Sequence, residues 1–253
     1  MNSGDAIDLH GVSLRYRLPT ERALSLRQHL WRGFTGLQRH TEFTALDGID
    51  LRIAPGESVG IIGRNGAGKS SLLRLIGRVM PPSTGRVRVR GRVAPVLHLG
   101  LGLHPELTGR ENILLLGTLL GGRRHELRQQ SDAILDWAEL QRFAAVPLRA
   151  WSSGMIARLA FAIATAGQPD ILLVDEALSV GDEGYRRKCY ARFAAMHREG
   201  RTLLIVSHLL DALITNCGRV IWLDAGRIKM DGPAQTVIAA YREWTIAAEG
   251  SIA

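Results

Sequence analysis

The segment at positions 63–70, GRNGAGKS, has residue types and spacing suited to holding phosphate groups. Its glycines let backbone N–H groups turn toward one point, and a helix that begins there adds its positive dipole end. Lys69 supplies a positive charge for the β- and γ-phosphates, and the Ser70 hydroxyl can ligate Mg²⁺. A plain glycine-rich turn would not require Lys followed by Ser, so the segment predicts a nucleotide-binding loop. The residues expected to contact the nucleotide here are Gly63, Arg64, Asn65, Gly66, Ala67, Gly68, Lys69, Ser70 and Ser71.

Two acidic residues follow a buried apolar run farther along the chain. Residues 171–174 (ILLV) read as a strand buried on both faces, and Asp175 and Glu176 come directly after it. Asp175 would lie at the carboxyl end of its strand, where open α/β sheets place ligands, and would orient Mg²⁺ through water. Glu176 can face the γ-phosphate and polarise the attacking water. Many strands end in a solvated Asp, but combined with a phosphate loop the pair predicts nucleotide hydrolysis.

A third apolar run, residues 203–206, ends in Ser207 and His208. A histidine at a strand end beside a phosphate site could contact the γ-phosphate and sense its presence. Taken alone, His208 is better read as a surface histidine after a strand.

The stretch WSSGM, Trp151 to Met155, places two hydroxyls and a glycine in front of a helix-forming run. Free N–H groups, hydroxyl donors and the helix dipole make such a helix start an anion site. The sequence of this stretch alone shows no anion for it to bind.

The elements that would position these residues alternate along the chain. Strand, glycine loop and helix follow one another at 59–76, and the apolar runs at 171–174 and 203–206 read as further buried strands. This order predicts an α/β fold with a phosphate loop at the carboxyl edge of a parallel sheet. Residues 85–93, GRVRVRGRV, alternate Val and Arg and predict a hairpin with an arginine-bearing solvent face.

Composition narrows the class of protein. The chain has 253 residues, 46% of them hydrophobic and 22% charged, which suits one sizeable globular domain. Cys189 and Cys217 lack paired spacing and read as buried thiols in a reducing compartment. Neither a secretory signal nor a run of ~18 apolar residues is visible, so we expect a soluble, cytoplasmic chain. The formal charge of +8 comes almost wholly from arginine and is weak evidence for nucleic-acid binding.

Taken together, these segments resemble the ATP-binding subunits of ABC transporters. WSSGM lies 24 positions before Asp175 and takes the place of the family's L-S-G-G-Q signature, which Ser152 and Gly154 match while Trp151, Ser153 and Met155 depart from it. The aromatic-S-S-G-M form is similar to the ATPases that export O-antigen, capsule and teichoic acid. Further segments that read like that export family are GIIGRNGAGKSSLLRLIGRVMPPSTGRV, LHPELTGRENI, SSGMIARLAFAIAT, PDILLVDEALSVGD and KCYARF.

The resemblance implies roles for individual residues. Ser152, Ser153, Gly154 and Met155 would face the γ-phosphate held by a second copy of the chain, and Asp182 would lie in the loop that crosses the dimer interface. His208 would be the switch histidine that acts with Glu176 and Lys69 in catalysis. Tyr16 would stack on adenine, although an aromatic residue beside a strand is more often plain packing. His98 stands where the family usually carries Gln or Glu near the metal-bound water, so its chemical role stays open.

The resemblance also implies the fold class and the partners. We expect one ABC ATP-binding domain over residues 1–253, with a RecA-like P-loop NTPase core, an antiparallel β subdomain and an α-helical subdomain near residues 96–165. ATP and Mg²⁺ would be its ligands, and two copies would form a homodimer. A separate integral membrane permease of the ABC-2 type would carry a lipid-linked polysaccharide, with the ATPase at the cytoplasmic face of the inner membrane. An appended sugar-binding domain is not expected.

An arginine-rich segment separates this chain from a minimal cassette. Residues 19–42 read as an amphipathic insertion, and residues 15–42 hold six arginines and two glutamates. The insertion could contact the permease, anionic headgroups or the pyrophosphate of a lipid-linked sugar. A helix packed on the core with a solvated basic side explains the pattern equally well.

Two other functions remain open at this point. The same chemistry could drive an importer, or an exporter of drugs or lipids, although the S-S-G-M signature and HPELTGREN argue against it. An ABC ATPase acting on DNA or ribosomes would need a long coiled-coil insertion or two nucleotide domains. The sequence shows neither feature, so we expect no nucleic-acid partner.

Overall fold

The computed structural model describes residues 4–19, 40–96, 102–175 and 183–250. Three residues singled out above, His98, Glu176 and Asp182, lie outside the described residues, as does most of the arginine-rich insertion. The described helices are α2 (Lys69–Ile76), α3 (Gly109–Leu119), α4 (Arg124–Ala138), α5 (Ser153–Ala166), α6 (Glu183–Arg198), α7 (Leu210–Asn216) and α8 (Ala234–Gly250), with short 3-10 turns at Gln141–Phe143 and Leu148–Ala150.

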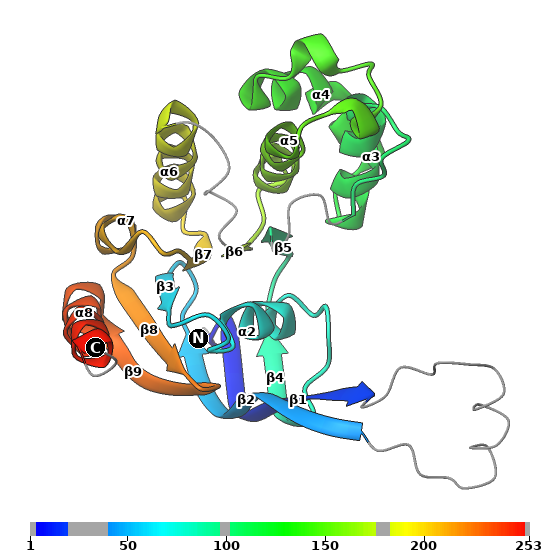
Figure 1. The fold of residues 1–253 in the computed structure, drawn as a ribbon. Helices are drawn as coiled ribbons and strands as arrows, with labels where there is room; N and C mark the ends of the chain where they lie inside the picture. Colours follow the sequence, from blue (N-terminus) through cyan, green and yellow to red (C-terminus); the bar gives the residue numbers. More distant parts are fainter. Residues whose placement is uncertain (1–3, 20–39, 97–101, 176–182, 251–253) are drawn as a thin grey trace, which may run out of the picture.

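A six-stranded sheet forms the centre of the molecule (Figure 1). Five of its strands run parallel and β9 pairs antiparallel with β8. The sequence predicted three of the parallel strands, and all three are fully or almost fully buried because layers cover both faces. Its strands, in spatial order, are β5 (Val93–Val96), β6 (Ile171–Asp175), β7 (Thr202–Val206), β3 (Ser58–Ile62), β8 (Arg219–Asp224) and β9 (Arg227–Pro233).

A second, three-stranded antiparallel sheet has the order β2-β1-β4, with β1 (Ile7–Pro19), β2 (His40–Ile53) and β4 (Thr84–Val89). Alternate residues of the central strands point to opposite faces, and this divides the core in two. One cluster packs the central sheet against α2 and the small sheet; the other packs it against α6 and α8. A third cluster lies within α3, α4 and α5.

The hairpin predicted at 85–93 is wrong. β4 pairs with β1 of the small sheet and β5 pairs with β6 of the central sheet, so the two strands belong to different sheets. The chain crosses between the sheets at Gly91, whose φ of 99° suits glycine. The alternation of Val and Arg correctly indicated a strand with a solvent face, but an alternating pattern does not specify the strand's partner.

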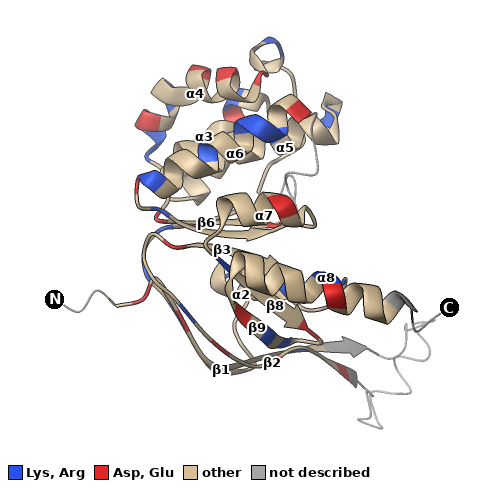
Figure 2. Cartoon of the chain, turned by 90° about the vertical axis from the view of Figure 1, so that its left-hand side faces the viewer, with Lys and Arg blue, Asp and Glu red and all other residues tan. Residues whose placement is uncertain are grey.

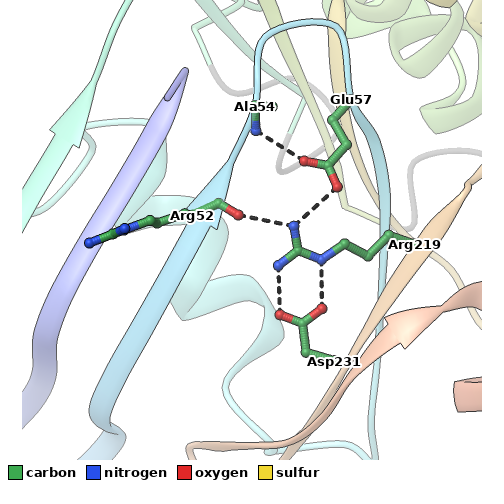
Figure 3. Close-up of polar contacts among 5 residues, drawn as sticks. All are labelled: Arg52, Ala54, Glu57, Arg219 and Asp231. Carbon is green, nitrogen blue, oxygen red and sulfur yellow. Dashed lines mark hydrogen bonds and ion pairs between the residues drawn. The ribbon is translucent and has the colours of Figure 1, made fainter. Parts of the chain in front are cut away.

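Arg219 of β8 links the turn before β3 to the edge strand β9 (Figure 3). Arg219 donates two hydrogen bonds to the Asp231 carboxylate, of 2.6 and 2.7 Å, and one of 3.0 Å to Glu57. These contacts raise the pKa of the Arg219 guanidinium, against the opposing effect of burial. Glu57 in turn accepts the Ala54 N–H at 3.0 Å. The turn that leads into β3 and the phosphate loop is therefore held at its base.

Among the described residues, no helix combines the length and the apolar character needed to cross a membrane.

Candidate nucleotide site

The loop between β3 and α2 is shaped by glycines in conformations that other residues avoid. Gly63, Gly66 and Gly68 have φ values of 148°, 82° and 103°. A Cβ atom at Gly63 would lie 2.2 Å from the Leu223 carbonyl oxygen, and one at Gly68 would lie 2.6 Å from that of Ala45. The loop thus needs glycine for close backbone approach as well as for its turn, which fits a cradle of backbone N–H groups for phosphate.

Lys69 is the first residue of α2 and is only 7% exposed. Its ammonium donates to the carbonyl oxygens of Gly63 at 2.8 Å and Arg64 at 3.1 Å. These bonds hold the positive charge against the loop, at the N-terminal end of the helix. The charge, the helix dipole and the loop N–H groups therefore all favour an anion at this position.

Three neighbouring parallel strands end at the edge that carries this loop. β7 lies between β3 and β6, and Val206 of β7 is paired with Ile61 on one side and with Asp175 on the other. With strand spacings of about 4.8 Å, the backbones at Ile61 and Asp175 are roughly 10 Å apart. β7 ends directly before Ser207 and the exposed His208. Lys69, Asp175 and His208, predicted from separate motifs, thus share one edge of the sheet.

The side chains near this edge suit a magnesium–nucleotide complex. Ser70 offers a hydroxyl in the first turn of α2, and Asp175 offers a half-buried carboxylate at the end of β6. No group of three or more His, Cys, Asp or Glu side chains forms a metal cluster within the described ranges. Mg²⁺ beside a nucleotide takes most of its ligands from phosphate and water and needs only one or two from the protein. The hard oxygen donors of Ser70 and Asp175 fit that pattern.

Tyr16 lies beside the phosphate-loop helix. Its hydroxyl is 3.3 Å from the Ser71 Oγ, and it also donates to the Met80 sulfur at 3.3 Å. The half-buried ring packs against the core cluster between the two sheets. The ring therefore packs on the core, beside the first turn of α2, and stacking of Tyr16 on adenine stays a prediction.

The predicted helix start at Ser152 is confirmed. Ser152 is the N-cap of α5, and its Oγ accepts the Met155 N–H at 3.2 Å. The hydroxyl hydrogen of Ser152 remains a donor, and the exposed Ser153 adds a second hydroxyl. The N–H groups of Ser153 and Gly154, in the first turn, have no carbonyl partner within the helix, as at any helix N-terminus. The arrangement offers an anion several donors at one point.

Helix α5, which begins within the WSSGM stretch and is called the signature helix below, and the phosphate loop lie in separate parts of the molecule. α5 is grouped with α3 and α4, whereas α2 lies against the small sheet and the central sheet (Figure 1). An anion held at the N-terminus of α5 would therefore be bound by other elements than an anion held by Lys69.

Sequence reasoning missed residues that support the phosphate loop and the start of α5. Gly226, in the β8–β9 turn, donates its N–H to the Ala67 carbonyl at 3.1 Å and buttresses the phosphate loop. Trp151 is 7% exposed, and a Cβ atom at Gly109 would lie 2.8 Å from its ring. Trp151, which departs from the usual signature, is therefore a buried packing residue, and its ring leaves room only for glycine at position 109. Nothing in the spacing of Gly109 and Trp151 along the chain signals this contact.

Comparisons with known proteins point to one family. A family model described as "ABC transporter" matches residues 46–179. The O-antigen export system ATP-binding protein RfbB of Myxococcus xanthus is 42% identical over 99% of this chain, which spans 59% of that protein's length. RfbB of Klebsiella pneumoniae is 43% identical, covering 82% of this chain and 84% of the relative. The teichoic acids export ATP-binding protein TagH of Levilactobacillus brevis is 38% identical, covering 97% of this chain and 67% of the relative.

The fold has close counterparts among solved structures. An ATP-binding cassette solved as a dimer in a post-hydrolysis state, bound to ADP and Pi, superposes with a TM-score of 0.73. It is 25% identical in sequence, and the match covers 90% of this chain and 98% of that one.

Proposed function

We propose that this chain, which belongs to the ABC transporter family, is the ATP-hydrolysing subunit of an exporter of lipid-linked polysaccharide. The observation that carries the hydrolytic part is the placement of Lys69, Asp175 and His208 at one sheet edge. The cargo rests on the S-S-G-M signature and on relatives named for O-antigen and teichoic-acid export.

Each residue has a distinct task in this proposal. The loop at 63–68 binds the phosphates through its N–H groups, and Lys69 stabilises negative charge on the β- and γ-phosphates. Ser70 and Asp175 would hold Mg²⁺, which neutralises phosphate charge when bound. Glu176 orients and polarises the attacking water, and His208 contacts the γ-phosphate. Tyr16 stacks on the adenine ring, and His98 lies near the metal-bound water.

Two copies complete each site. Ser152, Ser153, Gly154 and Met155 of one protomer face the γ-phosphate bound by its partner, and Asp182 lies at the interface between them. A two-fold arrangement then gives two equivalent sites, each built from both chains. ATP closes the dimer because its γ-phosphate bridges the protomers, and hydrolysis removes this bridge. The dimeric form of a solved cassette supports this arrangement.

The remaining parts of the proposal concern organisation and place in the cell. The chain forms one ABC domain, in which residues 96–165 are the helical subdomain and residues 19–42 an insertion that contacts permease, membrane or substrate. The permease is an integral membrane protein of the ABC-2 type, and it holds the ATPase at the cytoplasmic face of the inner membrane. No nucleic acid takes part.

The test of hydrolysis is the variant Glu176→Gln. We expect it to bind ATP and form a stable dimer but to lose turnover, because an amide does not polarise water as a carboxylate does. ATP hydrolysis and the elution volume with ATP are measured, and Glu126→Gln serves as the matched control. Glu126 is an exposed residue of α4 that pairs with Arg123 in the same helix region. Normal turnover in Glu176→Gln would reject Glu176 as the water-orienting residue.

The cargo class is tested by copurification from cells that make a surface polysaccharide. We expect a membrane permease of the ABC-2 type to copurify with the tagged chain. Copurification of a permease for another cargo supports the alternative transport function, while nucleic acid or ribosomes in its place would overturn the transport assignment.

A further inference from the structure

Helices α4, α5 and α6 meet at a cluster of charged and aromatic side chains, which we call the junction. It consists of Trp137 and Glu139 at the end of α4, Arg158 of α5, and Tyr185 and Lys188 of α6. The Glu139 carboxylate accepts hydrogen bonds from Arg158 at 3.2 Å and from Lys188 at 2.9 Å. One carboxylate therefore binds cations from two different helices.

The two cations are further held by aromatic rings. The Arg158 guanidinium lies 4.5 Å from the centre of the Tyr185 ring, and the Tyr185 hydroxyl donates to the Arg158 carbonyl at 3.4 Å. The Lys188 ammonium lies 5.2 Å from the Trp137 ring, which packs against the core clusters on both sides of it. Cation–π contacts add to the ion pairs at this point. The chain has only three lysines, so a lysine here stands out against the arginine elsewhere.

The junction lies near the beginning of both α5 and α6. α5 starts at Ser153, and Arg158 follows less than two turns later. α6 starts at Glu183, directly after the segment that contains Glu176 and Asp182 in the sequence, and Tyr185 lies in its first turn. The contacts thus join the helix that begins with the signature residues to the helix that follows the water-orienting and interface residues.

Glu139 occupies a backbone conformation that does not favour glutamate. As the C-cap of α4 it has φ 62° and ψ 38°, the left-handed region where glycine or asparagine is usual. Its side chain is half exposed, so burial does not explain the glutamate either. What a glutamate supplies there, and glycine would not, is the carboxylate that reaches Arg158 and Lys188.

We infer that Glu139 is a positioning residue, which fixes the start of the signature helix to the start of α6 so that the trans half-site is presented as one unit. This inference rests on the proposed function, because it assigns the joined elements to a closing ATP site. Glu139 would have an indirect part in the reaction. It acts through Arg158, Tyr185 and Lys188 on the elements that do.

The test separates positioning from folding through Glu139→Gly. Glycine relieves the left-handed strain but lacks the carboxylate, so we expect the melting temperature to stay within about 2 °C of the parent protein. Affinity of the monomer for ATP should be unchanged. In the Glu176→Gln background, the dissociation constant of the ATP-bound dimer should rise roughly five- to tenfold. A change of this size is usual for coupling between two sites. ATP turnover of the otherwise wild-type chain should fall similarly.

The matched control is Asp132→Asn, which removes a carboxylate from the same helix. Asp132 pairs with Arg110 of α3 and with no residue of α6 among the described contacts, so this variant should dimerise like the parent. Glu139→Asp keeps the charge and should restore part of the dimerisation, whereas Glu139→Asn should behave like Glu139→Gly. Undiminished dimerisation in the Gly and Asn variants would overturn the inference, and so would a loss matched by Asp132→Asn. Failure of the parent protein to dimerise with ATP would instead reject the proposed function.

Discussion

Gly63 and Gly66 share the phosphate loop but are required for different physical reasons. Both have positive φ, which disfavours any residue with a Cβ atom. At Gly66 that is the whole of the penalty, because nothing lies within 4 Å of where a Cβ atom would stand. At Gly63 the Cβ atom would also collide with the Leu223 carbonyl oxygen of β8. Gly63 is therefore needed both for the turn and for the close approach of the loop to β8, whereas Gly66 is needed for the turn alone.

Alanine substitutions at these two positions should therefore differ in stability. We expect Gly66→Ala to cost about 1 kcal/mol in free energy of unfolding, from backbone strain alone. Gly63→Ala should cost about 3 kcal/mol or more, because β8 must also move to admit the methyl group. Urea denaturation of both variants, without nucleotide, measures the difference. Equal losses at the two positions would show that the close approach to Leu223 carries no energetic weight.

At the scale of elements, the sequence anticipates the buried strands and the start of α5 because local chemistry determines them. Continuous apolar runs define β3, β6 and β7, and a serine before a helix-forming run defines the cap of α5. Strand partners and supporting contacts depend on tertiary geometry, which spacing does not contain. This is why the pairing of β4 with β1, and the junction at Glu139, emerge only from the structure.

The cap of α5 gives a prediction that separates folding from phosphate binding. Ser152 accepts the Met155 N–H, whereas Ser153 lies one residue inside the helix and caps nothing. Ser152→Ala should therefore lower the free energy of unfolding by about 1 kcal/mol, and Ser152→Gly by only a few tenths. Ser153→Ala should change it by less than about 0.5 kcal/mol, as expected for an exposed position. Thermal or urea unfolding of the three variants measures this order, and a larger loss at Ser153 would contradict the assigned cap.

At the scale of the whole molecule, two features matter: the distribution of charged residues and the separation of the two parts that can bind an anion. Acidic and basic positions are interspersed along the ribbon in Figure 2. Several arginines pair with carboxylates, as Arg242 does with Asp211. Under the proposed function, the phosphate loop and the N-terminus of α5 each supply one half of an ATP site. Closure between two chains is then a property of the pair of molecules and must depend on concentration.

That dependence makes the closed dimer measurable by melting in the Glu176→Gln background. ATP at about 100 times its dissociation constant stabilises by about 2.7 kcal/mol, which shifts the melting temperature by roughly 5–10 °C for a chain of this size. If two chains close around the nucleotide, the shift must grow further as protein concentration rises, since association is second order. Ser153→Glu in the same background places a negative charge at the signature helix, opposite the γ-phosphate. It should keep the shift due to nucleotide binding but lose its dependence on protein concentration. A concentration-independent shift in the parent would mean that ATP binds one chain without bridging two.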